Sequence, residues 1–174
     1  MKAKVEEIRK ALKNECYLSA LALTLTLPDI CSKIEYGPTS NRQHYIKWFD
    51  KHVGHYYAQG EFKKEVYEKL TFDGKACYAL RCSYLHAGNS SEINNDKRFL
   101  VNNFSLCISG GVDAYGTTSN SWSDDVEYKI RLDIVRLCLN ICSAVEAFYD
   151  CREDKSKFDI YTISVLDIIN FNKK

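Results

Sequence analysis

The sequence predicts a mainly α-helical fold, a bundle of four to five helices with a small β-hairpin or sheet added in the C-terminal half. Apolar residues recur every three or four positions, helix-capping residues precede several of these segments, and strand-like alternation is confined to the region after Gly88. The 174 residues fit the size of one domain and contain no internal repeat or linker. We therefore expect a single domain, 1–174.

The composition indicates a soluble globular protein, with 45% hydrophobic and 27% charged residues. The net charge of +1 creates no global field that would attract a nucleic acid or a membrane, although 24 basic residues are available for a local cluster. Charges interrupt the N-terminal segment throughout, unlike a secretory signal, and the most apolar stretch, 16–27, is too short to cross a bilayer. We expect a cytoplasmic protein without membrane contact.

Eight cysteines raise the question of disulfides or a zinc site. They form no Cys-x-x-Cys pair, and no histidine stands at a zinc-finger spacing from them. Most occupy apolar positions, where a free thiol behaves as a small hydrophobic group. We therefore expect reduced, structural cysteines, no metal and no cofactor. The cysteines are Cys16, Cys31, Cys77, Cys82, Cys107, Cys138, Cys142 and Cys151.

The first helix is predicted over 3–27, and beyond Cys16 its other faces are apolar too, which indicates burial on several sides. Pro28 should kink or restart this helix, because proline lacks the donor for the preceding turn. A short continuation then ends near Gly37 and Pro38. The recurring apolar residues are Val5, Ile8, Leu12, Cys16, Leu23 and Leu27.

A second helix is predicted to begin at Ser40, where Gln43 completes a capping box, and to end at Gly54. A weaker helical pattern covers 61–70. The apolar face of the second helix consists of Tyr45 or Ile46, Phe49 and Val53.

A third helix is predicted to begin within 71–73 and to end at Gly88, so that His86 falls in its last turn. Small side chains along one face allow another helix to approach closely. These residues are Ala76, Ala79, Ser83 and Ala87.

The region after Gly88 changes character. Segment 99–108 is rich in β-forming residues and 126–132 alternates in polarity, so both are predicted strands. The polar segment between them, 109–125, is interpreted as a solvated hairpin connection, with a mobile or functional loop as the alternative.

The C-terminal part contains a strong helical pattern. Asp133 is predicted to cap this helix. A charged turn over 150–157 and a strand-like segment over 158–169 follow. The helical face consists of Ile134, Leu137, Ile141, Val145 and Phe148.

Arg81 and His86, with four residues between them, are the candidate catalytic residues. Helical rotation separates them by roughly 140°, but arginine is long and His86 stands at an accessible helix end, where imidazolium is stabilised. A histidine poised near neutrality serves as a general acid or base, and a planar guanidinium matches a phosphate. The pair suffices for RNA transesterification without a metal, because RNA supplies its own 2′-hydroxyl nucleophile. Neither residue is expected in the apolar stripe of this helix, which consists of Cys77, Leu80 and Tyr84.

A structural interpretation competes with this one, because Arg81 would then pair with a nearby acid and His86 would cap its own helix end. His44, His52 and His55 lie on or beside the second helix without matching carboxylates, so we expect them to be surface or core residues. The basic residues near the N-terminus are expected to form a solvated helix face, or else to extend an RNA track.

The segment LRCSYLHAGN over 80–89, late in a helix of a helical core, resembles the HEPN superfamily. The early LALTLTLPDIC segment and the later IVRLCLNICSAVEAF helix look like the bundle of an uncharacterised bacterial branch. The resemblance covers most of the chain, and its specific part is the Arg–His segment. It implies a HEPN-like helical bundle that forms face-to-face dimers, with a composite site across the two-fold axis.

Carried over residue by residue, Arg81 matches the arginine and His86 the histidine of the family's Arg-x(4–6)-His motif. Cys82 departs from the family, which prefers a polar residue such as Asn at this position to orient the pair. The resemblance makes Cys82, Ser83 and Asn89 the expected binding residues beside the motif.

The resemblance implies a metal-independent endoribonuclease of bacterial defence or toxin–antitoxin growth arrest. The expected partners are RNA, a second copy of the chain, and an antitoxin or defence-system protein. The rivals are a non-catalytic HEPN-like binding or assembly module and a helical scaffold whose Arg–His pair is structural. Exposure of both side chains in one cleft favours the enzyme, whereas burial of His86 against an acid favours the scaffold.

Overall fold

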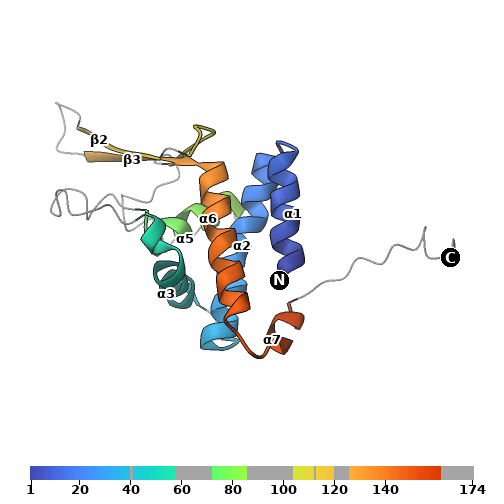
Figure 1. Ribbon diagram of the computed structural model, residues 1–174. Coiled ribbons are helices and arrows are strands. Elements are labelled where there is room, and N and C mark those ends of the chain that lie inside the picture. The colour runs from blue at the N-terminus through green and yellow to red at the C-terminus, as the bar shows by residue number, and fades with distance from the viewer. Residues whose placement is uncertain (40, 58–71, 86–103, 112, 120–125, 162–174) are drawn as a thin grey trace.

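The computed structural model of the chain describes residues 1–39, 41–57, 72–85, 104–111, 113–119 and 126–161. Within these ranges the protein is mainly helical, with a small sheet in the C-terminal half, as the sequence predicts (Figure 1). The elements in chain order are α1 (Lys2–Lys13), α2 (Tyr17–Tyr36), α3 (Arg42–His52), the 3-10 helix η1 (Gly54–Tyr56), α5 (Gly74–Leu85), β1 (Phe104–Cys107), β2 (Ala114–Ser119), β3 (Val126–Asp133), α6 (Ile134–Asp150) and α7 (Ser156–Asp159).

The prediction of one helix over 3–27 is wrong, because the chain turns between α1 and α2. Glu15 adopts a left-handed conformation with φ of 58°. The Cys16 N–H donates to the Ala11 carbonyl at 2.8 Å, and the Glu15 N–H donates to the Leu12 carbonyl at 3.1 Å. This pair of hydrogen bonds is the Schellman arrangement, which ends a helix most often at glycine. The turn lets α2 pack back along α1.

Helix α2 continues through Pro28, so of the two alternatives predicted at that residue, a kink or a restart, the restart is wrong. Side-chain hydroxyls bind carbonyls of the preceding turns: Thr24 donates to Ala20 at 2.7 Å, and Thr26 donates to Leu23 at 2.7 Å. The predicted end near Gly37 is confirmed, since Gly37 follows the helix with φ of 106°.

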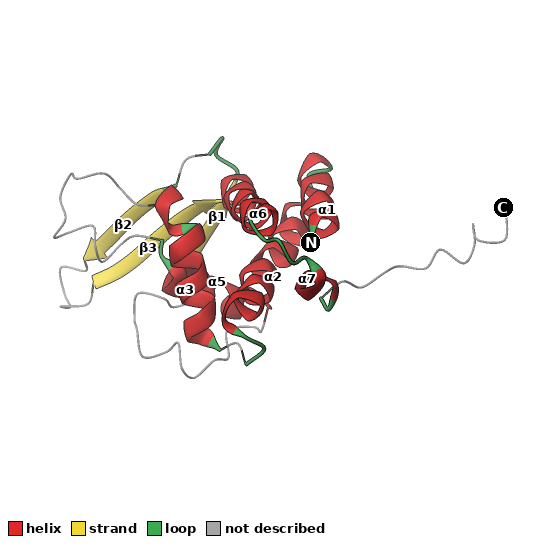
Figure 2. Ribbon diagram, turned by 60° about the horizontal axis from the view of Figure 1, so that its bottom comes forward, coloured by secondary structure: helices red, strands yellow, loops and turns green. Residues whose placement is uncertain are grey.

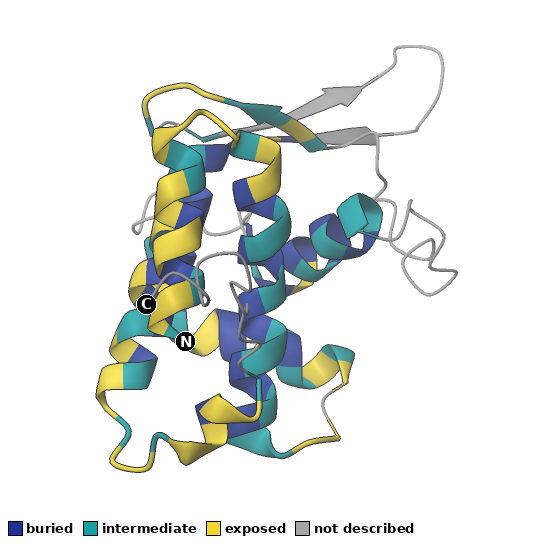
Figure 3. Ribbon diagram, turned by 90° about the vertical axis from the view of Figure 1, so that its right-hand side faces the viewer, coloured by how far each residue is buried: buried dark blue, intermediate teal, exposed yellow. Residues whose placement is uncertain are grey.

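Helix α2 is the centre of the bundle and contacts α1, α3, α5 and α6. Figure 1 shows α2 beside α6, with α1 on one side and α3 and α5 on the other. The predicted burial on several sides is confirmed. Buried residues line the inward sides of the helices, and exposed residues lie on their outward sides (Figure 3). The buried residues of α2 include Ala20, Leu21, Leu25, Leu27 and Cys31.

Helix α3 begins after Asn41, whose side chain accepts the His44 N–H at 3.1 Å, so the N-cap is Asn41 rather than the predicted Ser40. Helix α5 begins where predicted, because the Asp73 carboxylate accepts the Ala76 N–H at 2.9 Å. The two helices approach closely at Gly74, where a Cβ atom would lie 2.5 Å from the Ile46 carbonyl oxygen. Tight packing of α5 against α3 fixes the position of the residues discussed below.

The sheet has the strand order β1-β3-β2, with β1 parallel and β2 antiparallel to β3 (Figure 2). The hairpin therefore joins β2 to β3, whereas the sequence predicted one joining 99–108 to 126–132. Residues 114–119 form a strand within the segment that was predicted to be a loop. The predicted alternation of 126–132 is confirmed over 130–132, where Ile130 and Leu132 are buried and Arg131 is exposed.

Helix α6 begins as predicted at Asp133, whose carboxylate accepts the Arg136 N–H at 2.8 Å. The start of the predicted strand over 158–169 is wrong, since Phe158 belongs to α7 and packs its ring against Tyr149. Within the described residues, none of the helices has the length and apolar character needed to cross a membrane. The predicted helix over 61–70, the Gly88 end of the third helix, segment 99–103 and residues 162–169 lie outside the described residues.

Candidate active site at the end of helix α5

Three of the five predicted site residues lie on the last two turns of α5. Arg81 and Ser83 are half-buried, and Cys82 is buried. His86 directly follows Leu85, where the described part of α5 ends, so His86 and Asn89 lie outside the described residues. The geometry of the Arg81–His86 pair therefore lies outside the described residues and stays a prediction.

The Arg81 guanidinium packs against two tyrosine rings. Its central carbon lies 5.9 Å from the centroid of the Tyr45 ring on α3 and 5.8 Å from that of Tyr78, one turn earlier on α5. The two rings meet edge to face, with centroids 5.3 Å apart. A cation at this range is attracted by the negative faces of the rings. The aromatic pair therefore restricts where the guanidinium can lie.

Arg81 differs from the expectation in being partly inside the core. Its Nε atom is buried and has no hydrogen-bond partner among the described residues, and Tyr45 beneath it is 1% exposed. The structural alternative had Arg81 paired with an acid, but its contacts in the described part of the chain are aromatic. Two carboxylates on α2 and α3 have other partners: Asp29 binds Lys33 at 3.1 Å, and Asp50 accepts the Gly74 N–H at 2.6 Å.

A second arginine reaches the same aromatic pair from α3. The guanidinium carbon of Arg42 lies 5.9 Å from the centroid of Tyr78, and Arg42 forms no ion pair with a described residue. Arg42 and Tyr78 are both half-buried, so part of each side chain reaches the surface. The sequence reasoning missed Arg42, because the contact between α3 and α5 has no local pattern.

The thiols next to the aromatic pair face the core. Cys82 is 4% exposed, and burial together with the Cys82 thiol raises the pKa of the Tyr78 hydroxyl. Burial raises the pKa of the Cys77 thiol to about 12, and its Sγ atom lies 3.4 Å from the Tyr45 hydroxyl. That hydroxyl also donates to the Leu25 carbonyl at 3.2 Å. At neutral pH the Cys77 thiol and the hydroxyls of Tyr45 and Tyr78 are neutral, because the pKa of each is raised, so the positive charge at this place comes from the arginines.

The sequence reasoning also missed a carboxylate partner for His52. Its Nε2 atom lies 3.0 Å from Glu35 Oε2, while Lys51 Nζ lies 2.5 Å from Glu35 Oε1. The His52 ring stacks on Trp48, with centroids 4.9 Å apart. The expectation that His52 has no matching carboxylate is therefore wrong. The Glu35 side chain is 9% exposed, and its carboxylate is bound by Lys51 and His52 in a contact between α2 and α3.

The other described histidines pack on tyrosines, as surface or core residues would. His44 lies 5.2 Å from the Tyr36 ring and His55 lies 4.0 Å from the Tyr56 ring, measured between centroids.

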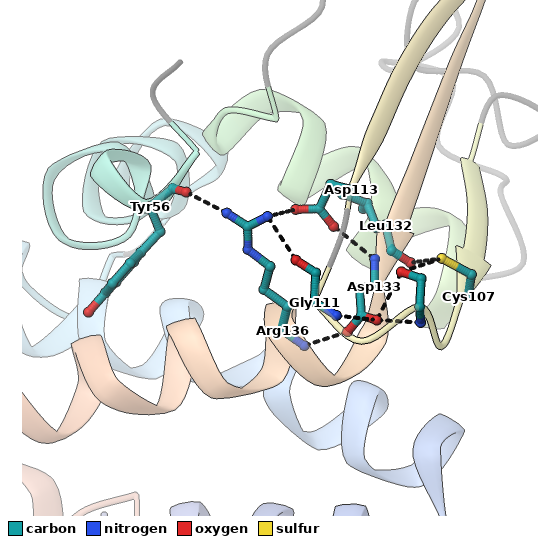
Figure 4. A network of polar contacts seen from close by, with 8 residues as sticks. Tyr56, Cys107, Gly111, Asp113, Leu132, Asp133 and Arg136 are labelled. Atoms are coloured by element: carbon teal, nitrogen blue, oxygen red, sulfur yellow. Dashed lines mark hydrogen bonds and ion pairs between the residues drawn. The ribbon is translucent and has the colours of Figure 1, made fainter. Parts of the chain in front are cut away.

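The most extensive polar network lies apart from α5, where the sheet joins α6 (Figure 4). The Asp133 carboxylate accepts the N–H groups of Ser109 at 2.6 Å and Gly111 at 3.1 Å. Arg136 binds Asp113 at 3.1 Å and donates to the Tyr56 carbonyl at 3.1 Å. These partners satisfy one another and tie the sheet and η1 to α6, so the network has a structural role.

Among the described residues, no three His, Cys, Asp or Glu side chains are grouped so as to hold a metal ion. The comparisons with known proteins give no match: no family model, no curated protein and no solved structure is significantly similar to the chain. The residues around Arg81 therefore carry the functional proposal.

Proposed function

We propose that this protein is a metal-independent endoribonuclease of the HEPN type, with Arg81 and His86 as its catalytic residues. The observation that carries the proposal is the Arg81 guanidinium, which is held by two aromatic rings instead of by a carboxylate among the described residues. An arginine paired with an acid would have to break that pair to bind a phosphate. Arg81 has no such pair to break within the described part of the chain, and its planar guanidinium fits the oxygens of a phosphodiester.

The proposed reaction is an attack of the RNA 2′-hydroxyl on the adjacent phosphorus. The bond from phosphorus to the 2′-oxygen forms and the bond to the 5′-oxygen breaks, which leaves a 2′,3′-cyclic phosphate and a 5′-hydroxyl. Arg81 stabilises the charge on the phosphate oxygens. His86, one position beyond the described end of α5, takes the proton from the 2′-hydroxyl or supplies one to the leaving oxygen.

A homodimer is part of the proposal. Positions 81 and 86 are separated by roughly 140° around a helix, so one chain does not stack the two side chains directly. Two copies related by a two-fold axis would place the arginine of one beside the histidine of the other. We propose cytoplasmic RNA as the substrate, within bacterial defence or growth arrest controlled by an antitoxin or defence-system partner.

The test is cleavage of single-stranded RNA in the presence of EDTA. We expect a 2′,3′-cyclic phosphate product and no cleavage of DNA, which lacks the 2′-hydroxyl. His86→Ala should reduce the rate by roughly 10²–10⁴-fold. His55→Ala is the matched control, because His55 is exposed and packs on Tyr56, and it should leave the rate unchanged.

The Arg81 variant needs a stability control, because Arg81 packs on the buried Tyr45. Arg81→Lys keeps the charge but loses the two-pronged hydrogen bonding, so we expect little residual activity. Thermal unfolding of each variant separates a loss of chemistry from a loss of fold. A fully folded wild-type protein that cleaves no RNA, or cleavage unaffected by His86→Ala, would contradict the proposal.

A non-catalytic binding module is the second candidate function, and the burial of Cys82 favours it. The family prefers a polar residue there to orient the catalytic pair, whereas this thiol faces the core. RNA binding that depends on Arg81, without cleavage by the wild-type protein, is the result that would select this candidate.

A further inference from the structure

Two arginines from different helices converge on one tyrosine. Arg42, the first residue of α3, and Arg81, in the last turns of α5, place their guanidinium carbons 5.9 Å and 5.8 Å from the Tyr78 ring centroid. Tight packing of the two helices at Gly74 fixes this arrangement. All three side chains are half-buried, so each has a restricted position and an exposed part.

Both guanidiniums are charged at every physiological pH, and like charges that share one ring repel each other. Neither forms an ion pair with a described residue. Asp29 binds Lys33, and Asp50 accepts the Gly74 N–H. A bound anion would relieve this repulsion. The chemical class that fits two planar guanidiniums beside one ring is a chain of phosphates.

We propose that Arg42 binds a second, non-scissile phosphate of the same single-stranded RNA whose scissile phosphate Arg81 binds, with Tyr78 as the positioning residue between them. The inference rests on the proposed function for the identity of the ligand. It assigns Arg42 to substrate binding, not to the chemical step. Loss of Arg42 therefore raises KM and weakens binding, while kcat is nearly unchanged.

The binding test uses a single-stranded RNA oligonucleotide with 2′-O-methyl groups throughout, because this probe keeps the phosphates and lacks the nucleophile. We expect Arg42→Ala to weaken binding by about tenfold, the size of one charge-assisted hydrogen bond. The slope of log Kd against log salt concentration should fall by about 0.7, the value for one phosphate contact on a single strand. Arg42→Lys should restore the slope, because it restores the charge.

Arg131→Ala is the matched control. Arg131 is exposed on β3, so this variant removes the same charge away from α3 and α5, and it should leave both Kd and the salt slope unchanged. Two variants test the positioning role of Tyr78. Tyr78→Phe retains the ring and should bind the probe normally, whereas Tyr78→Ala should weaken binding. The melting temperature of each variant is measured as a control for folding.

The outcomes separate the two proposals. If the wild type cleaves RNA but Arg42→Ala and Arg131→Ala bind the probe equally well, the assignment of Arg42 is wrong and the proposed enzyme stands. If the probe binds through Arg42 and the wild type cleaves no RNA, the second phosphate contact stands and the catalytic proposal fails. A wild-type protein that does not bind the probe overturns the assignment of Arg42.

Discussion

Replacing Asp133 with alanine tests how the sheet is attached to the helical bundle. Asp133 is 0% exposed, and its carboxylate accepts four hydrogen bonds. One comes from the Arg136 N–H at the start of α6, at 2.8 Å. The others come from the Ser109 N–H at 2.6 Å, the Ser109 hydroxyl at 3.1 Å and the Gly111 N–H at 3.1 Å. One side chain therefore both caps α6 and holds the turn that follows β1.

The expected loss follows from these contacts. Removing an N-cap carboxylate costs about 1 kcal/mol. The Ser109 and Gly111 N–H groups lose their carboxylate acceptor, at about 0.5–1 kcal/mol each, because this turn is near the surface and water replaces part of the bonding. The free energy of unfolding should fall by about 2–3 kcal/mol. For a chain of this length the melting temperature should fall by about 6–10 °C.

The measurement is urea unfolding followed by circular dichroism, with thermal melts alongside. Asp150→Ala is the matched control, because Asp150 ends the same helix, is exposed, and pairs with Lys2 at the surface at 3.1 Å. Such a pair contributes about 0–1 kcal/mol, so this variant should unfold almost as the wild type does. A loss in Asp133→Ala no larger than that in Asp150→Ala would refute the structural role of the network.

Three further predictions concern pH, assembly and metal, and a fourth concerns Arg81. The pKa values of Glu35 and Asp133 are lowered in the folded protein: burial opposes this, but the donors around each carboxylate outweigh it. The stability that these two carboxylates add to the fold is therefore complete above the ordinary carboxyl pKa of about 4, and it is lost as the pH falls through their lower folded pKa values. Urea unfolding midpoints measured at several acidic pH values test this. The midpoint of Glu35→Gln should depend less on pH than that of the wild type. Light scattering after size exclusion should give about twice the chain mass of 20.0 kDa, and a monomer at high micromolar concentration would contradict the composite site. Elemental analysis should find no stoichiometric zinc, whereas one zinc per chain would overturn the structural interpretation of the cysteines. Arg81→Met should keep the free energy of unfolding within about 1 kcal/mol of the wild-type value and should lose RNA cleavage. A severe loss of stability would favour the scaffold interpretation.

Sequence patterns predict the helices that are determined by residues close together in the chain. Asp133 caps α6 because its side chain meets an N–H three residues later, and the apolar stripe of that helix is buried as its spacing requires. The break between α1 and α2 has no such pattern, since Glu15 occupies a left-handed position that usually belongs to glycine. Burial of α2 also holds Pro28 within a helix that its local chemistry would interrupt.

The sheet could be predicted in part. Alternation identified β3, but β2 lies in a segment of glycine, serine and threonine whose polarity suggests a loop. Its strand conformation depends on pairing with β3, and pairing partners are set by the tertiary structure. The parallel pairing of β1 with β3 is likewise set by the tertiary structure, because β1 and β2 pair with opposite edges of β3.

The sequence points to Arg81 as a candidate site residue, but it does not predict which residues surround Arg81. A motif identified Arg81, but Tyr45 and Arg42 come from another helix, and no spacing in the sequence relates them to α5. The pairing of His52 with Glu35 is of the same kind, since these residues lie on different helices. Contacts between helices determine whether an arginine is neutralised, and the sequence alone does not give those contacts.

The contacts of Arg81 bear more directly than the motif on the choice between the enzyme and the scaffold interpretations. A scaffold arginine contributes to stability by pairing with an acid, as Arg9 does with Glu146 at 2.6 Å. Arg81 instead places a permanent charge on a partly buried ring pair, with a buried Nε–H that no described residue accepts. A methionine would pack on the same rings without that desolvation cost. This environment supports the proposal that Arg81 binds an anion from outside the chain, and Arg81→Met tests it against a stabilising role of the cation on the rings.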